Sequence, residues 1–188
     1  MNFKFDTRDL ALSGVFAGLY VVLNLVQMVT VGNPTIFGPI QLRVADCLIA
    51  LAALLGWPVV AGVTVGCVVV NAFGTIGPID IVFGSIANFV AATLVVMLRK
   101  RSLLACIAGA FPIGIIVGGG YLWWFFPMYD ILGVSLHPML ATMVSITVST
   151  LIVMAGIGYV LLKIMGRPGI LESLKSHGLK TLTHKRMS

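Results

Sequence analysis

The stretch LALSGVFAGLYVVLNLVQMVTV, residues 10–31, contains no charged residue and consists mainly of apolar side chains. A helix that crosses a bilayer needs about 20 mostly apolar residues, so this stretch is long enough to cross. It is too long for the apolar part of a secretory signal, and no cleavage signal follows it. We therefore expect it to form a first membrane-spanning helix that is retained.

The composition extends this expectation to the whole chain. Of 188 residues, 59% are hydrophobic and 10% are charged, and the mean hydropathy is +1.09. A soluble domain carries about 25% charged residues, which excludes a soluble enzyme, and disorder is excluded because it requires low hydrophobicity. Six spans of about 20 residues would occupy about 120 residues and leave short loops. We expect one all-α integral membrane domain.

Glycine and proline residues divide the long charge-free stretches into candidate helices. Glycine adopts backbone angles that other residues avoid, and proline ends a helix at the residue before it. Gly-Trp-Pro at 56–58 and Gly-Pro at 77–78 are two such boundaries. Cutting the chain at these points predicts six helices, at residues 10–31, 40–56, 57–74, 79–98, 102–126 and 137–163.

The basic residues indicate how these helices cross the membrane. Arg99–Arg101 form a short cluster, further cations lie from Lys163 to Arg186, and Lys4 and Arg8 precede the first helix. With six spans and a cytoplasmic N-terminus, all of these cations lie inside, as the positive-inside rule requires. Without the second helix, the cluster and the basic tail would both lie outside. We therefore expect a multi-pass protein of the cell membrane, surrounded by lipid, with both termini cytoplasmic.

The last part of the chain, residues 166–188, is polar and basic. We expect a membrane domain at residues 1–165 and a cytoplasmic tail at 166–188. In the tail we expect a short interfacial helix near Ile170–Leu174 and weak structure elsewhere. Because the cations flank helices as topogenic residues do, we do not expect nucleic-acid binding.

No pattern of catalytic or metal-binding residues is visible. Cys47, Cys67 and Cys106 lie in apolar stretches without C-x-x-C spacing, which predicts small buried side chains instead of disulfides or a metal site. No nucleophile and base share one depth, and no phosphate-loop motif occurs. We therefore expect no enzymatic activity, no bound metal or cofactor, and no ATP binding by this chain.

The polar residues of the expected helices gather near one membrane surface. Arg43 and Asp46 are three residues apart and share one face of the second helix, and Asp80 begins the fourth helix. Ionisable residues within membrane spans are expensive to bury and indicate function. Their common depth predicts a binding site that is open to the outside, and no path through the membrane. The candidate residues of this site are Gln41, Arg43, Asp46, Asn71 and Asp80.

Two structural alternatives stay open for these charges. Arg43 and Asp46 can neutralise each other and simply anchor the second helix. Asp80 can cap the start of the fourth helix and interact with the helix dipole.

An aromatic cluster ends the fifth helix, at residues 121–129. Trp and Tyr favour the headgroup level of a bilayer, so a belt at the membrane surface is one interpretation. The other is that one or two rings face inward and stack on a planar ligand, with Tyr121 and Trp124 as the candidates. Gly118-Gly119-Gly120 just before the cluster predicts close helix packing or a local break in the helix.

The first helix carries a G-x-x-x-G pair, Gly14 and Gly18. Small residues at this spacing let another helix approach closely. The pair can serve packing within the bundle or docking of a separate subunit.

Three segments, FGPIQLRVAD at residues 37–46, GCVVVN at 66–71 and GPIDIVFGS at 77–85, resemble the QueT family. The resemblance covers residues 8–165 and is strongest over 37–98. Members of this family are substrate-binding S components of energy-coupling-factor (ECF) transporters, assigned to the uptake of queuosine precursors.

This resemblance implies a six-helix S component with cytoplasmic termini and an outward-facing site. It also implies partners, namely a transmembrane coupling subunit with two ATPase subunits. S components commonly dock through an Ala-x-x-x-Ala element on the first helix, and Gly14 and Gly18 occupy the corresponding places here.

Together, the residues and the resemblance predict binding of a small planar heterocycle, a 7-deazaguanine such as preQ0, preQ1 or queuine. A carboxylate accepts neighbouring N–H donors in pairs, which suits Asp46 or Asp80. Arg43 and Gln41 can reach a carbonyl, and Asn71 can orient the rim. An S component for another vitamin or base is the alternative. A stand-alone secondary transporter is a further one, although neither inverted repeats nor midplane ion sites are visible.

Overall fold

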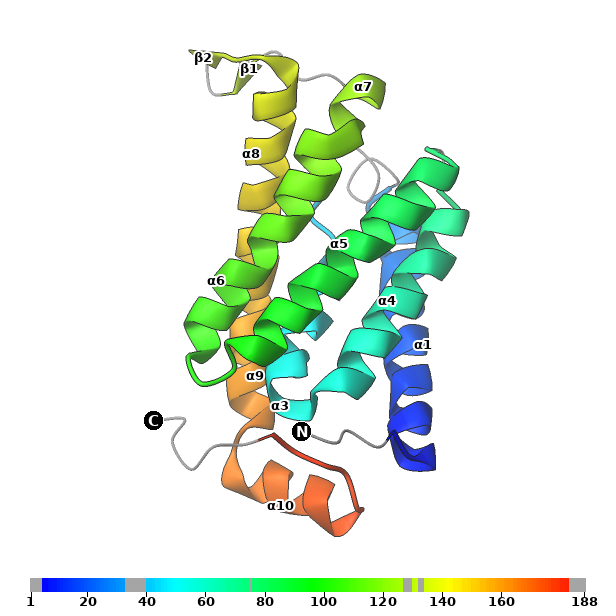
Figure 1. The fold of residues 1–188 in the computed structure, drawn as a ribbon, viewed down its shortest axis with the longest axis vertical. Helices are drawn as coiled ribbons and strands as arrows, with labels where there is room; N and C mark the ends of the chain where they lie inside the picture. Colours follow the sequence, from blue (N-terminus) through cyan, green and yellow to red (C-terminus); the bar gives the residue numbers. More distant parts are fainter. Residues whose placement is uncertain (1–4, 33–39, 75, 127–129, 132–133, 183–188) are drawn as a thin grey trace.

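The computed structural model describes residues 5–32, 40–74, 76–126, 130–131 and 134–182, which form a bundle of helices (Figure 1). The long helices run along the long axis of the molecule. A two-residue antiparallel hairpin, β1 Asp130–Ile131 with β2 Val134–Ser135, lies at the upper end in this view. The expected all-α class is confirmed for the described residues, with this hairpin as a small addition.

Four helical stretches in the described part of the chain are long and apolar enough to cross a membrane. They correspond to the first, fourth, fifth and sixth expected helices. A capping box starts the first of them, because the Asp6 carboxylate accepts from the backbone N–H of Asp9 and the Asp9 carboxylate accepts from that of Asp6. The four stretches are α1 (Thr7–Thr30), α5 (Pro78–Met97), Ser102–Phe125 and Pro138–Met165.

The last two stretches each change to a wider π-helix in their middle. Pro112 lies in the last turn of α6, where it cannot donate a backbone hydrogen bond, and the π-helix begins two residues later. Gly118 packs directly against the neighbouring stretch, since an added Cβ would lie 2.8 Å from Met143 Cα. The expected close packing at this glycine is therefore present. The segments are α6 (Ser102–Ile113), η2 (Gly114–Leu122) and α7 (Trp123–Phe125), then α8 (Pro138–Leu151), η3 (Ile152–Gly158) and α9 (Tyr159–Met165).

The second helix differs from the prediction of a spanning helix at 40–56. It consists of a 3-10 helix, η1 (Val44–Leu51), followed by α3 (Ala52–Leu55), and it is buried from Ala45 to Leu55. At the rise of these helix types it is roughly 22 Å long, less than the hydrocarbon thickness of about 30 Å. It is an interior element surrounded by the other helices.

The side chain of Gln27 explains why this helix starts late. Its Nε2 donates to the Leu42 carbonyl at 2.8 Å, and its Oε1 accepts from the Val44 N–H at 2.9 Å. These backbone groups are therefore satisfied without a helix. Residues 41–43 form neither a helix nor a strand, and Arg43, the residue before η1, has an extended backbone.

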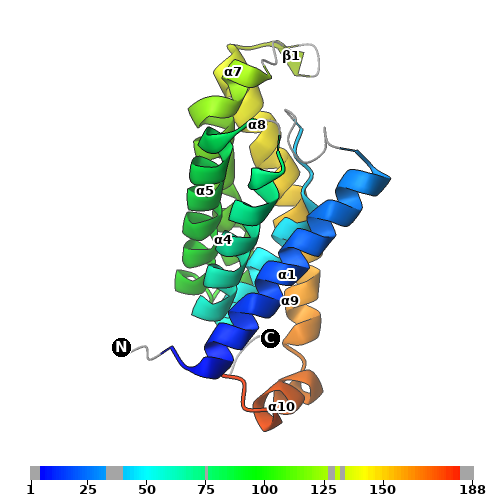
Figure 2. The ribbon, with the colours of Figure 1, turned by 90° about the vertical axis from the view of Figure 1, so that its right-hand side faces the viewer.

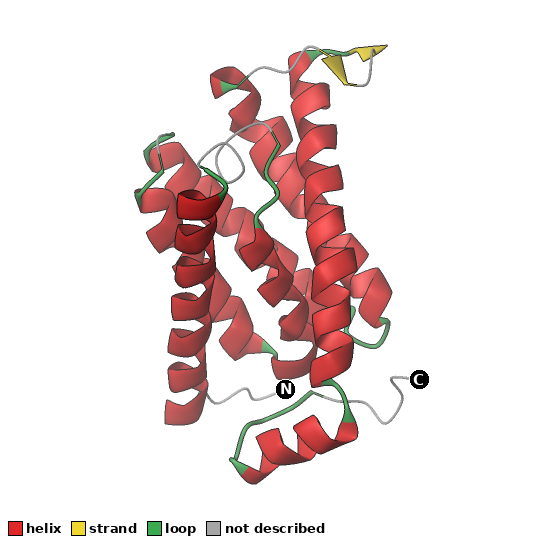
Figure 3. Ribbon diagram, turned by 180° about the vertical axis from the view of Figure 1, so that it is seen from behind, coloured by secondary structure: helices red, strands yellow, loops and turns green. Residues whose placement is uncertain are grey.

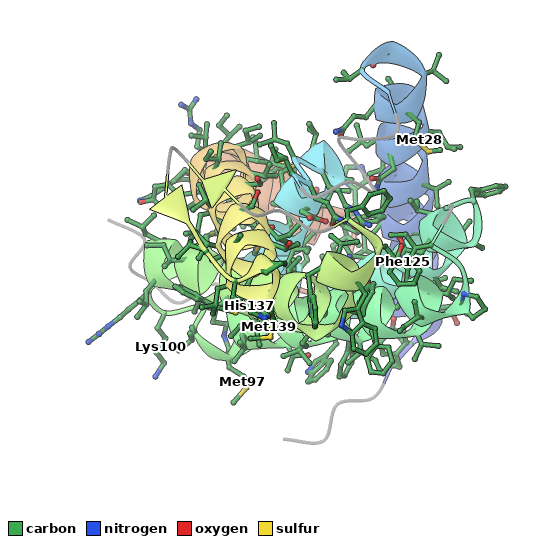
Figure 4. All side chains as sticks on the ribbon, turned by 90° about the horizontal axis from the view of Figure 1, so that it is seen from above. Met28, Met97, Lys100, Phe125, His137 and Met139 are labelled. Atoms are coloured by element: carbon green, nitrogen blue, oxygen red, sulfur yellow. The ribbon has the colours of Figure 1, made fainter. Side chains whose placement is uncertain are left out.

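The third helix, α4 (Trp57–Ala72), packs along α1 through two glycines. A Cβ at Gly62 would lie 2.6 Å from Phe16 Cβ, and one at Gly66 would lie 2.8 Å from Tyr20 Cβ. Gly62 and Gly66 thus form a G-x-x-x-G contact that the sequence analysis did not identify. Beyond this contact, α1 leans away from the other helices toward Met28 (Figure 2, Figure 4).

The C-terminal part of the described chain folds back onto the bundle. The predicted short helix is present as α10 (Pro168–Ser176), which lies across the lower end of the bundle (Figure 3). Residues 177–182, which we call the C-terminal strap, then return to the bundle, and the Leu182 N–H donates to the Leu54 carbonyl at 2.7 Å. Residues 177–182 form no helix or strand, and this hydrogen bond ties their end to the bundle. The membrane domain was expected to end at residue 165, which is the last residue of α9.

Candidate functional site

Arg43, Asp46 and Asp80 come together in the interior of the bundle, although they lie on different elements. Arg43 precedes η1, Asp46 lies in its first turn, and Asp80 lies in the first turn of α5. Their exposed fractions are 4%, 2% and 0%. Arg43 Nη2 lies 3.9 Å from Asp80 Oδ2, and electrostatic attraction also links Arg43 to Asp46. One guanidinium therefore serves two buried carboxylates.

Asp80 is held by residues of two further helices. The Tyr121 hydroxyl from η2 donates to Asp80 Oδ1, and Asn71 Nδ2 from the last turn of α4 donates to the Asp80 carbonyl at 2.8 Å. Gly84 makes this approach possible, because a Cβ there would lie 2.5 Å from Asn71 Nδ2 and 3.2 Å from Asp80 Oδ1. The structure thus brings the predicted residues Asn71, Asp80 and Tyr121 into contact.

Asp46 has a different set of partners. The Tyr20 hydroxyl of α1 donates to Asp46 Oδ1 at 2.7 Å, and Asn88 Nδ2 of α5 donates to the Tyr20 hydroxyl oxygen at 2.9 Å. Both partners are buried. The chain of hydrogen bonds fixes the Asp46 carboxylate between two helices, and each carboxylate of the site is hydrogen-bonded to one tyrosine.

The sequence analysis missed Tyr20 and Asn88. A signal for Tyr20 existed, because Tyr20, Asn24 and Gln27 recur at helical spacing along one face of the first helix. All three are buried. Polar residues on one face of an apolar membrane helix point to the bundle interior, and this face of α1 is the one that meets η1 and the segment before it.

Several buried polar atoms of the predicted site residues have no hydrogen-bond partner among the described residues. They are an amide donor, Gln41 Nε2, and two acceptors, Asn71 Oδ1 and Asp80 Oδ2. Gln41 is 2% exposed and Asn71 is 0% exposed. Buried polar groups in folded proteins normally find partners, so a polar ligand that supplies both acceptors and donors would complete this arrangement.

Trp124 lies outside this arrangement. Its exposed fraction is 66%, and it packs edge-on against Trp123, which in turn contacts His137. Figure 4 shows His137 and Phe125 over different parts of the upper face of the bundle. The position of Trp124 fits the interpretation as a membrane-surface residue, and our proposed binding site does not include it. Tyr121, at 3% exposure, is the inward-facing member of the aromatic cluster.

In the described residues, no group of three or more His, Cys, Asp or Glu is placed to hold a metal ion. Cys47, Cys67 and Cys106 are buried free thiols. Cys67 lies within the polar cluster, with its Sγ 4.0 Å from Arg43 Nη1 and 3.5 Å from Asn71 Nδ2. The cluster offers charge and hydrogen bonds suited to recognition.

The predicted docking pair, Gly14 and Gly18, faces away from the bundle. A Cβ at either position would meet nothing within 4 Å, whereas Gly62 and Gly66 make the close contact between α1 and α4. An apolar groove of about 390 Å³ lies beside Gly14, and its walls come from both helices. Packing within the described bundle therefore does not explain the Gly14/Gly18 pair.

Comparison with known proteins places the chain beside one family. The sequence model of the QueT transporter family matches residues 10–167, which includes every residue of the cluster. No match was found among curated proteins or among solved structures.

Proposed function

The chain belongs to the QueT transporter family, and from this premise we propose that it is the substrate-binding S component of an ECF transporter. Its proposed substrate is a queuosine precursor of the 7-deazaguanine type, taken up from outside the cell. The observation that carries this proposal is the buried cluster of Arg43, Asp46 and Asp80, together with buried polar atoms of Gln41, Asn71 and Asp80 that have no hydrogen-bond partner among the described residues.

The polar atoms of the cluster match the edge of a guanine-like ring. Such an edge presents neighbouring N–H donors next to a carbonyl acceptor. Asp80 Oδ2 and Asn71 Oδ1 are the acceptors available for the N–H groups, and Gln41 Nε2 is a donor available for the carbonyl, with Arg43 close by. A buried group left unpaired by the wrong ligand costs about 1–3 kcal/mol, so this pattern favours one class of heterocycle.

The proposed orientation puts the substrate site toward the outside of the cell membrane. The start of α1, the Arg99–Arg101 cluster after α5, and α10 all lie at the lower end of the bundle (Figure 1). Under the positive-inside rule this end is cytoplasmic. Asn71 lies in the last turn of α4 and Asp80 in the first turn of α5, so the site lies toward the opposite end. The basic tail at 166–188 would then be cytoplasmic, and the membrane domain would comprise residues 1–165.

The proposed partners are a transmembrane coupling subunit and two ATPase subunits. Gly14 and Gly18 face away from the bundle and would receive a helix of the coupling subunit. The apolar groove between α1 and α4 continues this surface. Within a membrane such helix pairs gain mainly from van der Waals packing, which small residues permit. This chain would supply substrate specificity, and the ATPases would supply the energy for transport.

The experiment that tests the substrate is identification of the ligand carried by the protein. The chain is purified from cells supplied with queuosine precursors, and the extracted small molecules are measured by mass spectrometry. We expect a 7-deazaguanine at near-stoichiometric amounts. Another vitamin or base in its place would contradict the substrate while leaving the S-component role intact. Uptake by this chain without any coupling subunit would contradict the S-component role.

A further inference from the structure

The interior helix η1 is wound more tightly than its own residues favour. It has eight residues, VADCLIAL, without glycine or proline, and Ala and Leu are among the best α-helix formers. The Asp46 N–H nevertheless bonds to the Arg43 carbonyl at 3.1 Å, and the Ala52 N–H bonds to that of Ile49, three residues back. A 3-10 helix seldom runs beyond three or four residues, because its hydrogen bonds are poorer. Contacts outside η1 must therefore favour this winding.

The tighter winding also makes η1 longer. A 3-10 helix rises by about 2.0 Å per residue, and an α-helix rises by about 1.5 Å. The eight residues therefore span about 16 Å in the 3-10 form and would span about 12 Å in the α form. Compared with an α-helix of the same residues, η1 is stretched by about 4 Å.

The upper end of η1 is anchored by the side chain of Gln27 on α1. Its Nε2 donates to the Leu42 carbonyl at 2.8 Å, and its Oε1 accepts from the Val44 N–H at 2.9 Å. These two groups belong to the peptide bonds on either side of Arg43, the residue before η1. Because Gln27 is only 7% exposed, both bonds are largely shielded from water, which strengthens them.

The lower end is anchored where α3 stops. The Leu54 carbonyl accepts from the Leu182 N–H at 2.7 Å. The Leu182 side chain lies over Gly56, where an added Cβ would come within 2.7 Å of it. At Gly56, which has a φ of 74°, the chain turns directly into α4. The helix formed by η1 and α3 is thus held between Gln27 at one end and the C-terminal strap and α4 at the other.

We propose that η1 is a length switch, which changes between 3-10 and α-helical winding and so moves the Arg43 and Asp46 end of the proposed substrate site by about 4 Å along the bundle. Gln27 is the positioning residue that selects the longer form. The role of the movement, which is to give the site two shapes during transport, rests on the proposed function.

Rewinding would turn Asp46 as well as move it. An α-helix turns by about 100° per residue and a 3-10 helix by about 120°. Between Asp46 and Ala52 this difference adds up to about 120°. The Asp46 carboxylate would therefore leave the Tyr20 hydroxyl, from which it accepts at 2.7 Å in the longer form.

The neighbours of η1 permit such a turn. Gly158 of η3 faces small residues of η1, since a Cβ there would lie 3.1 Å from the Cys47 carbonyl oxygen and 3.0 Å from Ala50 Cβ. Helices interlock through ridges of side chains, and glycine, alanine and cysteine form only low ridges. η3 is itself a π-helix, a wide winding that is frequent at functional sites.

The test measures the length of η1 without any ligand. Spin labels are attached at Leu42→Cys, just before η1, and at Lys100→Cys, an exposed position after α5 at the lower end. The distance between them is measured by double electron–electron resonance on the full-length chain in lipid nanodiscs. Gln27→Met, which keeps the side-chain length but removes both hydrogen bonds, should shorten this distance by up to about 4 Å.

Two controls separate rewinding from a general change of the bundle. Asn24→Leu removes a buried amide one turn earlier on α1, whose Nδ2 donates to the Tyr20 carbonyl of the same helix. It should leave the distance between the labels at positions 42 and 100 unchanged. Labels at Phe73→Cys, an exposed position at the end of α4, and Lys100→Cys should keep their distance in every variant.

An unchanged distance between positions 42 and 100 in folded Gln27→Met would overturn the length switch. Equal shortening by Asn24→Leu would overturn the assignment to Gln27, and equal shortening between positions 73 and 100 would show general compaction instead of rewinding. If Gln27→Met does not fold, Gln27→Asn takes its place, because its shorter amide cannot bridge both peptide groups. No outcome depends on a ligand, so failure of the proposed substrate would leave this result in place.

Discussion

Asp80 is the residue through which three helices meet in the proposed substrate site. It accepts from Tyr121 of η2, its carbonyl accepts from Asn71 of α4, and Arg43 lies 3.9 Å from its second oxygen. A residue that only capped α5 would need none of these partners. The cap alternative is also weakened because no side chain forms a capping hydrogen bond at the start of α5.

Replacing Asp80 with Asn should therefore weaken ligand binding by about 2–5 kcal/mol, the scale for loss of a buried charge contact. Tyr121→Phe removes one hydroxyl donor and should weaken ligand binding by about 1 kcal/mol. Trp124→Phe, at an exposed position, is the control and should stay within about 0.5 kcal/mol of the wild type. Calorimetry with the identified ligand measures all three, and unchanged affinity of Asp80→Asn would remove this residue from the site.

At the scale of the element, α1 has two faces with different tasks. The buried face carries Phe16, Tyr20 and Gln27, which meet α4, Asp46 and the segment before η1. The opposite face carries Gly14 and Gly18, around which nothing lies within 4 Å. One helix thus connects the proposed substrate site with the proposed docking surface.

A leucine at Gly14 should abolish uptake in cells that contain the coupling subunits, because the added side chain would hold the partner helix away. Ligand affinity of the isolated protein should stay within about 0.5 kcal/mol of the wild type. Gly156→Leu is the matched control, since Gly156 of η3 is also exposed with nothing within 4 Å. Uptake that Gly14→Leu and Gly156→Leu leave equally intact would contradict docking at Gly14.

The opposite result is expected for Gly66, which faces α1. The Cβ of a side chain there would lie 2.8 Å from Tyr20 Cβ and 3.0 Å from the Ala17 carbonyl oxygen, which is too close for either contact. Gly66→Leu should lower stability by about 1–3 kcal/mol or more through overpacking. Thermal unfolding in detergent measures this, with Gly14→Leu as the folded control. Equal melting temperatures of the two variants would show that α1 and α4 are not tightly packed at this point.

The whole molecule is closed at its lower end by the C-terminal strap. Lys180 Nζ lies 2.8 Å from Asp6 Oδ2 and 2.9 Å from Asp9 Oδ2, and Arg8 Nη1 donates to the Gly178 carbonyl at 3.3 Å. The side chain of Leu182 lies over Gly56, at the turn between α3 and α4. The two ends of the described chain are thereby tied to each other and to the base of the bundle.

The contact between Lys180 and Asp6 makes the stability of the folded chain depend on pH. The hydrogen bond from Lys180 lowers the pKa of Asp6 from its ordinary value of 3.8 to about 2, with help from the backbone N–H of Asp9. Because the folded pKa is the lower one, Asp6 contributes stability above about pH 4, and this contribution is lost as the pH falls toward 2. Lys180→Met should remove that part of the acid dependence in thermal unfolding between pH 4 and pH 2. If the stability of the variant and that of the wild type changed identically with pH, the contact between Lys180 and Asp6 would not be the cause.

The order of apolar and polar residues in the sequence was enough to predict the fold class of this protein and most of its helices. Apolar runs such as residues 10–31 and 79–98 are long enough that only a membrane helix satisfies their backbone groups, and Gly-Pro boundaries such as 77–78 mark where they stop. Charged and amide residues in such runs are costly, so Arg43, Asp46, Asn71 and Asp80 could be selected as a candidate site without any structure. These inferences depend on local composition, which is written directly in the chain.

Only the tertiary structure decided which partners these residues have. The late start of η1 depends on the Gln27 side chain, which precedes Leu42 by 15 residues, and the Tyr20–Asp46 contact joins residues 26 positions apart. The strap depends on Lys180 and Asp9, which are 171 positions apart. Likewise, two G-x-x-x-G pairs look alike in sequence, yet Gly62 and Gly66 face α1, whereas Gly14 and Gly18 face away from the bundle. The spacing of residues in the sequence shows that a helix has a distinct face. Which neighbour that face contacts depends on how the helices pack.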